Sequence, residues 1–263
     1  MTAASVPILM YHQLTPRPAP EFSRYAITPR RFAAQMACLS LMGYRAVGLD
    51  AVLDRQALPR RAVVITFDDA IEGCSEYALP VLRHRRFTAT FYVVAGLVGE
   101  RSRWTRSEIG IELPLMDWRA LRTLMAAGFQ IGSHTMTHPR LPTLSPMACR
   151  DELVRSRRLL EDRLGRHVAH LAYPFGAFDA SVRAIAAEAG YRSACTTRPS
   201  LASVDDDPLA LPRVNVYGHD SLLDFACRVR SARSAGELIR QCRARRPFHP
   251  SAQPSSPAGQ PPA

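Results

Sequence analysis

The stretch Ala62-Val63-Val64-Ile65-Thr66-Phe67-Asp68-Asp69-Ala70 decides the fold and gives the first indication of chemistry. Residues 62–67 form a short apolar, β-prone run, which predicts a buried strand, and two carboxylates follow it directly. Carboxylates at the end of a buried strand are costly unless a metal or hydrogen-bond donors compensate them. Neighbouring side chains of an extended chain point in different directions, so one carboxylate can bind a metal while the other meets the water beside it. A simple cap on the next helix is the alternative at this point.

Similar apolar runs recur along the chain and alternate with helical patterns. They predict strands at residues 7–11, 44–47, 62–67, 88–94, 129–133, 168–173, 191–196 and 211–216. Thr28-Pro29, Asp117 and Ser145-Pro146 open three of the intervening helices, and Val182, Ile185 and Ala189 mark a further one that ends at Gly190. Repeated strand–helix alternation predicts an α/β fold with a parallel sheet, and about eight strands favour closure into a barrel. In such barrels the chemistry lies where strands end and loops begin, at the C-terminal face.

The composition is that of a soluble globular protein. The chain has 263 residues, of which 47% are hydrophobic and 22% charged, a length that suits one large domain. The first apolar stretch, residues 6–11, is too short for a signal-peptide core, and no run is long enough for a membrane span. We therefore expect a cytoplasmic protein. Its six cysteines form no C-x-x-C pair and are expected to be free thiols.

The net charge of +11 is concentrated near the C-terminus. All basic residues are arginines, and seven of them lie between Arg228 and Arg246 against a single acid, Glu237. We expect a domain over residues 1–227, a basic helical segment over 228–247 and a disordered tail over 248–263. The basic segment is either a solvated helix face or a peripheral contact with an anionic membrane. Nucleic-acid binding is not expected, because no recognition motif or aromatic platform accompanies the arginines.

A second polar motif, Gly132-Ser133-His134-Thr135-Met136-Thr137-His138, also follows a predicted strand. The His-x-x-x-His spacing puts two imidazoles on one side of a helical turn, close enough to share a cation. With a carboxylate from another strand end, such a set leaves coordination positions open for water and a substrate oxygen. Two surface histidines are the alternative.

A third motif, Leu171-Ala172-Tyr173-Pro174-Phe175-Gly176, lies at the end of a further strand. Proline and glycine fix a tight loop there, and its backbone N–H groups can face the site. The N–H of Phe175 is a candidate donor to an oxyanion. A turn with ordinary aromatic packing is the alternative.

Together, T-F-D-D at 66–69, S-H-x-x-x-H at 133–138 and Y-P-F-G at 173–176 resemble the polysaccharide deacetylase family, also known as the NodB-homology domain or carbohydrate esterase family four. The resemblance extends from about residue 7 to residue 225. It implies a deformed (β/α) barrel in which Asp68 is the general base and Asp69, His134 and His138 are the metal ligands. Zinc is the default cation, with cobalt, nickel or manganese as alternatives.

The chain departs from the usual family pattern in the loops that follow two strands. Ala70 stands where the family usually has glycine, which restricts the backbone of that loop. Ala172 stands where the family usually has an arginine that orients the base. Arg213, which arrives from a different strand, is our substitute for it, and an ordinary surface arginine is the alternative.

The C-terminal L-x-H motif that usually supplies the catalytic acid is also missing. The first strand, however, ends in His12, and in a closed barrel the first and last strands can be neighbours. We assign the acid to His12, an arrangement that resembles the branch containing deacetylases of poly-N-acetylglucosamine biofilm polymers. His219 is the competitor. The remaining histidines with no site context are His84, His167 and His170.

The resemblance implies a metal-dependent hydrolase that removes N-acetyl groups from N-acetylglucosamine-type poly- or oligosaccharides. Two alternatives stay open. One is a deacylase or deformylase of a lipid-linked sugar at the cytoplasmic membrane face, which suits the basic segment. The other is a non-catalytic saccharide-binding protein, against which the intact base and ligand residues argue.

Overall fold

The computed structural model describes residues 5–54 and 58–244, with side chains through residue 241. All eight predicted strands are present. They are β2 (Ile8–Tyr11), β5 (Arg45–Ala46), β6 (Ala62–Phe67), β7 (Thr90–Val93), β8 (Gln130–Ser133), β9 (His170–Ala172), β10 (Ser193–Pro199) and β12 (Leu211–Asn215). Four two-residue strands were not predicted from the sequence, namely β1 (Ser5–Val6), β3 (Gln13–Leu14), β4 (Ala26–Ile27) and β11 (Ala202–Ser203).

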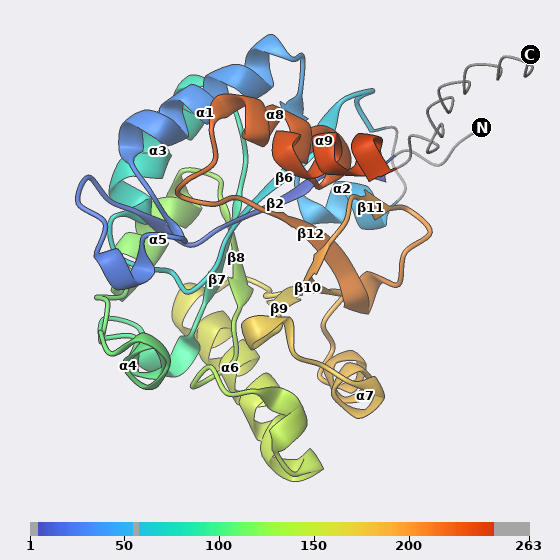
Figure 1. Cartoon of the computed structure of the whole chain (residues 1–263). Helices are drawn as coiled ribbons and strands as arrows, with labels where there is room; N and C mark the ends of the chain where they lie inside the picture. Colours follow the sequence, from blue (N-terminus) through green and yellow to red (C-terminus); the bar gives the residue numbers. More distant parts are fainter. Residues whose placement is uncertain (1–4, 55–57, 245–263) are drawn as a thin grey trace, which may run out of the picture.

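Within the described residues, seven parallel strands close into a barrel in the order β2-β12-β10-β9-β8-β7-β6 (Figure 1). The ring closes because β2 pairs with β12 on one side and with β6 on the other, so that Leu9 lies opposite both Val214 and Ile65. The predicted eighth strand, β5, pairs only with the first two residues of β6. The first and last strands of the barrel are therefore neighbours.

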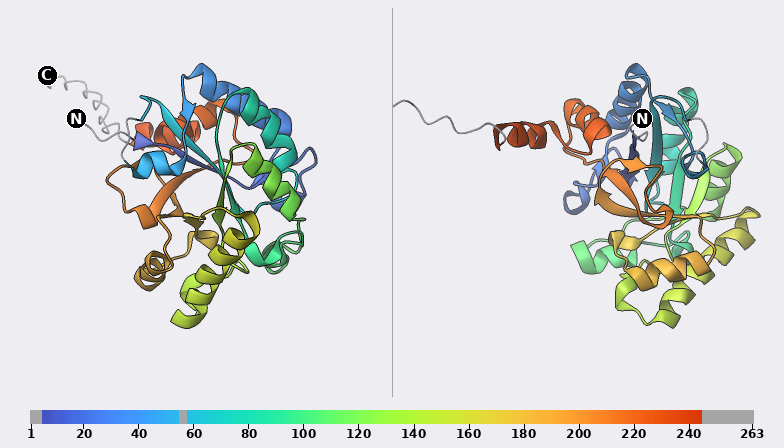
Figure 2. Two further views of the ribbon diagram at one scale, coloured as in Figure 1. Left: turned by 180° about the vertical axis from the view of Figure 1, so that it is seen from behind. Right: turned by 90° about the vertical axis from the view of Figure 1, so that its right-hand side faces the viewer.

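Helices surround the barrel (Figure 2). The predicted ones begin at the expected caps: Thr28 for α1 (Pro29–Leu41), Asp117 for α5 (Trp118–Ala126) and Ser145 for α6 (Pro146–Leu164). The predicted helix around residue 185 is α7 (Ala180–Glu188). Among the described α-helices, three had no counterpart in the prediction, namely α2 (Leu49–Leu53), α3 (Cys74–His84) and α4 (Arg103–Ile109).

The strand side chains divide into two sets because alternate residues of a strand face opposite sides. Odd-numbered residues of β2 and β6, such as Leu9 and Phe67, join the apolar cluster formed with the surrounding helices. Even-numbered residues, such as Ile8 and Val64, form a separate cluster with Leu49 of α2. The second cluster fills the barrel interior, and α2 covers the end at which the strands begin. Toward the C-terminal ends of the strands, the same inward-facing rows of residues lead to the polar residues at the mouth of the barrel.

The C-terminal part of the described chain consists of α8 (Leu222–Ser231) and α9 (Ala235–Ala244). The expected boundary at 227/228 falls inside α8, where Phe225 and Val229 on either side of it are both fully buried. Helix α9 lies on the outside of the molecule beyond α8 (Figure 2). Residues 245–247 of the basic segment and the tail over 248–263 lie outside the described residues. No described helix is long and apolar enough to cross a membrane.

Candidate active site

A cleft of about 530 Å³ opens at the mouth of the barrel, where the strands have their C-terminal ends. Six of the seven side chains predicted for the site line it, and they come from the segments that follow four different strands, β2, β6, β8 and β9. These are His12, Asp68, Asp69, His134, His138 and Phe175. The seventh, Arg213, is fully buried directly behind Asp68.

Asp69, His134 and His138 converge at the floor of this cleft. The Nε2 atoms of both histidines lie 3.4 Å from Oδ1 of Asp69, and all three side chains are buried. Oδ1 of Asp69 has no hydrogen-bond partner among the described residues, which is costly for a buried carboxylate oxygen unless a cation compensates it. One carboxylate and two imidazoles form the donor set of an open, hydrolytic zinc site. The three residues therefore fit a divalent metal.

His134 is held in the tautomer that a metal needs. Its Nδ1 lies 2.7 Å from the carbonyl oxygen of Ala172 and donates to it, which leaves the lone pair of Nε2 free on the side of Asp69. Such an outer-shell hydrogen bond is a usual companion of a metal-bound histidine. Ala172, the residue that replaces the family's usual arginine, thus contributes its backbone to the site.

The segment between the two histidines is a loop, so the predicted helical turn over residues 134–138 is wrong. Thr135 and His138 have φ values of 68° and 65°, outside the right-handed helical region. The carboxylate of Glu152, on α6, accepts hydrogen bonds from the backbone N–H groups of Met136 and Thr137. These N–H groups are thereby satisfied without a helical turn, and the two imidazoles still meet, with ring centroids 4.7 Å apart.

Backbone strain is concentrated around this site. Of the seven non-glycine residues with positive φ in the described part of the chain, five belong to the three motif loops. They are Asp69, Ala70, Thr135, His138 and Phe175. Ala70 has φ 51°, a conformation that glycine adopts without cost, which explains why the family usually has glycine there. Clustered outliers of this kind are typical of functional sites.

Asp68 is paired with Arg213 through two hydrogen bonds. Nη1 and Nη2 of the guanidinium lie 2.7 and 2.6 Å from the two carboxylate oxygens, and Arg213 is 0% exposed. Burial alone would raise the pKa of Asp68, but the charge and the hydrogen bonds of Arg213 outweigh it and lower that pKa. Asp68 is therefore held as an oriented, ionised carboxylate. Arg213 reaches it from β12, 145 positions away in the sequence.

The two histidines that compete for the role of acid lie in different surroundings. His12 lines the cleft, and its Nδ1 is buried without a hydrogen-bond partner among the described residues. Burial lowers the pKa of His12, and the nearby Asp69 and Asp68 carboxylates partly oppose that effect. His219 is exposed, stacks on Tyr217 with centroids 5.4 Å apart, and lines a separate surface depression. Of the two, only His12 faces the cleft.

Phe175 lies at the edge of the cleft in a strained turn. Its φ is 58°, and its ring meets the ring of His138 at a centroid distance of 4.7 Å and an angle of 69°. The guanidinium of Arg140 lies over the same ring, 3.9 Å from its centroid. The residue predicted for its backbone N–H thus also packs against the candidate metal site with its side chain.

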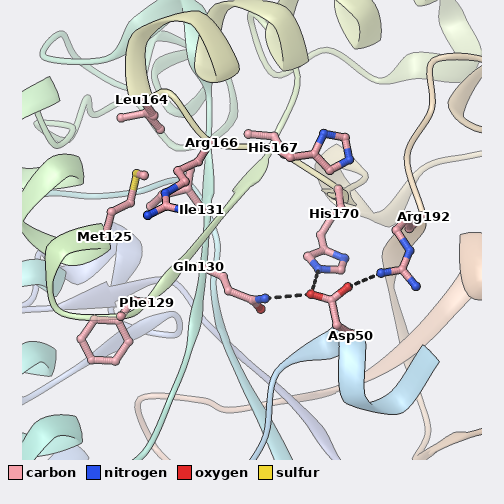
Figure 3. Close-up of a pocket in the computed structure, with 13 residues that line it drawn as sticks. Asp50, Met125, Phe129, Gln130, Ile131, Leu164, Arg166, His167, His170 and Arg192 are labelled. Atoms are coloured by element: carbon pink, nitrogen blue, oxygen red, sulfur yellow. Dashed lines mark hydrogen bonds and ion pairs between the residues drawn. The ribbon is translucent and has the colours of Figure 1, made fainter. Parts of the chain in front are cut away.

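Figure 3 shows a second cavity, of about 450 Å³. Gln130 and His170, the first residues of β8 and β9, line it, so it lies at the N-terminal end of the barrel, opposite the cleft. Asp50 reaches into it from α2 and accepts hydrogen bonds from Gln130 and Arg192, at 3.0 and 2.7 Å. Nε2 of the buried His170 lies 3.4 Å from the same carboxylate. His170 begins β9, at the N-terminal face, where barrel residues generally serve stability. These contacts tie α2 to the lower end of the barrel.

Sequence reasoning missed several residues that line the cleft. Asn215 and Tyr217 follow Arg213 at alternate positions, so the inward row of β12 was a usable signal. Tyr25 comes from the turn before β4 and Trp104 from the short helix α4, and neither carried a periodic signal. Trp104, on α4, stacks directly on His138.

Comparisons with known proteins agree with this geometry. The family model for polysaccharide deacetylase matches residues 55–194. YxkH of Bacillus subtilis, whose name places it among the polysaccharide deacetylases, is 27% identical over 217 residues, which are 81% of this chain and 72% of the relative. A poly-β-1,6-N-acetyl-D-glucosamine N-deacetylase of Staphylococcus aureus is 22% identical over 74% of this chain and 69% of its own length.

Two solved structures are similar over most of the chain. The Streptococcus pyogenes deacetylase PplD, in complex with acetate, has a TM-score of 0.74 and 25% identity, and the match covers 87% of this chain and 99% of that one. IcaB from Ammonifex degensii has a TM-score of 0.71 and 28% identity, covering 81% and 92%. The fold and the site thus define a deformed (β/α) barrel of the deacetylase type. The chain belongs to the polysaccharide deacetylase family.

Proposed function

We propose that this protein is a metal-dependent hydrolase that removes N-acetyl groups from N-acetylglucosamine-type poly- or oligosaccharides. One observation carries the proposal: the buried Asp69–His134–His138 set lies beside the buried Asp68–Arg213 pair at one cleft, and Oδ1 of Asp69 has no hydrogen-bond partner among the described residues. Family membership and the names of the relatives, which include a chitooligosaccharide deacetylase of Bradyrhizobium, support carbohydrate deacetylation. A non-catalytic saccharide-binding protein would not need either buried arrangement.

Asp69, His134 and His138 would hold the metal, with zinc as the default and cobalt, nickel or manganese as alternatives. When bound, the metal supplies Lewis acidity, which polarises the acetamide carbonyl and lowers the pKa of a water molecule. Imidazole must be neutral to ligate a metal. For His134, burial is outweighed by the hydrogen bond with Asp69 and the charges of Asp68 and Asp69, so its pKa is raised in the metal-free site. Burial lowers the pKa of His138, with Asp69 opposing it in part.

Asp68 is the proposed base. It receives the proton of the attacking water, and the two hydrogen bonds from Arg213 keep its carboxylate ionised and aimed. The N–H of Phe175, which makes no hydrogen bond among the described residues, is the proposed donor to the developing oxyanion. His12 is the proposed acid, which donates a proton to the leaving amine.

The proposal is tested first by metal content. Elemental analysis should find about one divalent metal per chain, as in a mononuclear site. The His134→Ala and His138→Ala variants should lose most of it, whereas Asp68→Asn should keep it but lose turnover. His167→Ala, at an exposed histidine that pairs with Glu161, is the matched control and should behave like the wild type. Full metal retention in both ligand variants would remove this site from consideration.

The substrate is tested by a panel of acylated sugars. β-1,4- and β-1,6-linked N-acetylglucosamine oligomers of several lengths, with lipid-linked and N-formylated sugars beside them, would be incubated with the metal-loaded protein. Mass spectrometry should then show loss of acetyl groups from the oligomers. Turnover of the lipid-linked sugars alone would favour the deacylase alternative.

The lipid-linked alternative has one structural observation in its favour. The segment over α8 and α9 carries exposed side chains of Leu222, Leu223 and Ile239 and exposed arginines at 230, 233 and 240. Apolar side chains among cations are suited to an anionic membrane surface. A truncation to test it should end after residue 232, because Arg228 is buried in an ion pair with Asp220. Removing residues 233–263 takes away Ile239 and the arginines at 233 and 240 but leaves Leu222, Leu223 and Arg230, so binding to anionic vesicles at low salt should weaken. No binding by the intact protein would end the idea.

A further inference from the structure

The two proposed metal histidines are held in different ways. His134 donates from Nδ1 to the carbonyl oxygen of Ala172, which fixes its ring. The corresponding Nδ1 of His138 is buried and has no hydrogen-bond partner among the described residues. A metal-bound histidine usually has such an outer-shell partner, and its loss weakens the site. Another contact must therefore fix the ring of His138.

That contact is aromatic. Trp104 stacks on the imidazole of His138 with ring centroids 4.3 Å apart and planes inclined by 23°. Phe175 meets the same imidazole edge-on, at 4.7 Å and 69°, and His134 does so at 4.7 Å and 74°. The imidazole thus has one stacked and two edge-on neighbours, which together oppose rotation about its Cβ–Cγ bond.

Trp104 is itself firmly placed. It lies in the first turn of α4. Ser102 and Thr105, which flank it in the sequence, have buried hydroxyl groups whose oxygens are 2.6 Å apart. Oγ1 of Thr105 also lies 2.7 Å from the carbonyl oxygen of Ile111, and Oγ of Ser102 accepts a hydrogen bond from the N–H of Leu113 at 2.8 Å. The start of α4 is therefore tied to the segment that follows it. The indole packs against the apolar cluster of that region.

Phe175 is connected to the same helix. Arg140 stacks on its ring and lies 3.4 Å from the carboxylate of Glu108, also on α4. That ion pair is exposed on both sides, so it contributes little. The stacked indole is the stronger of the two links between α4 and the metal site.

We propose that Trp104 is a positioning residue for the proposed metal ligand His138. By stacking, it fixes the ring orientation of His138, as the Ala172 carbonyl oxygen fixes that of His134. The inference rests on the proposed metal site, because it concerns the orientation of one of its ligands. Its consequence is that α4, which lies outside the three motifs, controls metal affinity.

The test is a zinc dissociation constant, measured by chelator competition. Trp104→Leu, which keeps bulk but removes the ring, should weaken zinc binding by about 10-fold or more, the usual loss for an outer-shell partner. Trp104→Phe keeps a ring and should restore most of that affinity. Trp118→Leu, at the protein's other tryptophan, should be unchanged, because that residue lies on α5 away from the cleft.

A double-mutant cycle separates positioning from general structural damage. The Trp104→Leu loss should disappear in the His138→Ala background and persist in the His134→Ala background. Saturating zinc should also return the zinc content of Trp104→Leu to about one ion per chain. An equal loss in both histidine backgrounds, or wild-type affinity in Trp104→Leu, would overturn the inference.

A fluorescence measurement covers the case in which Trp104→Leu does not fold. In the Trp118→Phe variant the remaining tryptophan is Trp104, and cobalt should quench its emission strongly, because paramagnetic ions quench nearby indoles. In Trp104→Phe, cobalt should leave the emission of Trp118 nearly unchanged. Cobalt bound without quenching of Trp104 would refute the stacking while leaving the proposed function intact. No metal bound by the wild type would instead refute the proposed function.

Discussion

Replacing Arg213 with methionine is the perturbation whose size the structure defines best. The guanidinium makes two hydrogen bonds to Asp68, one to Thr66 Oγ1 at 3.2 Å and one from Nε to the carbonyl oxygen of Thr196 at 2.8 Å. Both ends of the Arg213–Asp68 pair are buried. Removing one partner of such a pair leaves an uncompensated buried charge and costs about 3–5 kcal/mol. For a domain of this size that is a fall in melting temperature of about 6–20 °C.

The same variant should lose activity for a separate reason. Without Arg213, only the weaker effects of His134 and His12 oppose burial, so the pKa of Asp68 rises and less of the proposed base is ionised. We expect turnover to fall by about 10²–10⁴. Because the base returns as pH rises through the raised pKa, Arg213→Met should recover activity at high pH. Asp68→Asn should not recover at any pH.

The assay combines thermal unfolding with kinetics for the two single variants and the double variant. Asp68→Asn/Arg213→Met carries neither charge, so its stability loss should be smaller than the sum of the single losses, while its activity stays absent. Arg183→Met, at an exposed arginine that pairs with Asp207, is the control and should cost at most about 1 kcal/mol. Additive stability losses, or an Arg213→Met variant with wild-type turnover, would refute the reasoning.

Three further predictions concern the acid, the lower end of the barrel and the core. His12→Ala should lower kcat by about 10²–10⁴ and flatten the alkaline limb of the pH–rate profile, with metal content unchanged. His219→Ala should have little effect on kcat, and the opposite ranking of the two variants would assign the acid to the C-terminal region. The pKa of Asp50 is lowered to about 2, mainly by His170, so its stabilisation is present above about pH 4 and lost as pH falls toward that pKa. Asp50→Asn should therefore lower the free energy of unfolding, measured with denaturant, by about 1 kcal/mol at neutral pH and leave it unchanged in strong acid. The effect is small because solvent screens this partly exposed group. Phe67→Ala should cost about 3–5 kcal/mol, because the fully buried ring stacks on Phe91 at 4.6 Å, and an unchanged melting temperature would contradict the packing described.

The barrel was predictable because its strands are buried and apolar. The run over 62–67 matches β6 at both ends, since every residue of that strand is buried. Helices α3 and α4 were not predicted, for reasons that lie in their local sequences. Helix α3 contains Pro80 and starts after Gly73, both of which argue against a helix in sequence reasoning. Helix α4 has seven residues and no side-chain cap.

The site was predictable where motifs fall at strand ends, and unpredictable where contacts depend on tertiary structure. Strand order explains the first part, because the carboxyl ends of parallel strands meet at one mouth. The conformation of the loop between His134 and His138 depends on Glu152, a residue of α6 that no local pattern connects to them. Trp104 reaches His138 from a segment with no periodic signal. Metal identity, substrate and a cytoplasmic location stay predictions.

The most direct test of the central claim is the release of acetate from N-acetylglucosamine oligomers by one preparation taken through three states. The protein as purified should release acetate, a chelator should abolish the release, and about one equivalent of zinc per chain should restore it. Asp68→Asn, reconstituted in the same way, should bind zinc and release none. Acetate release that survives complete removal of metal, or an Asp68→Asn variant that turns over like the wild type, would contradict the account.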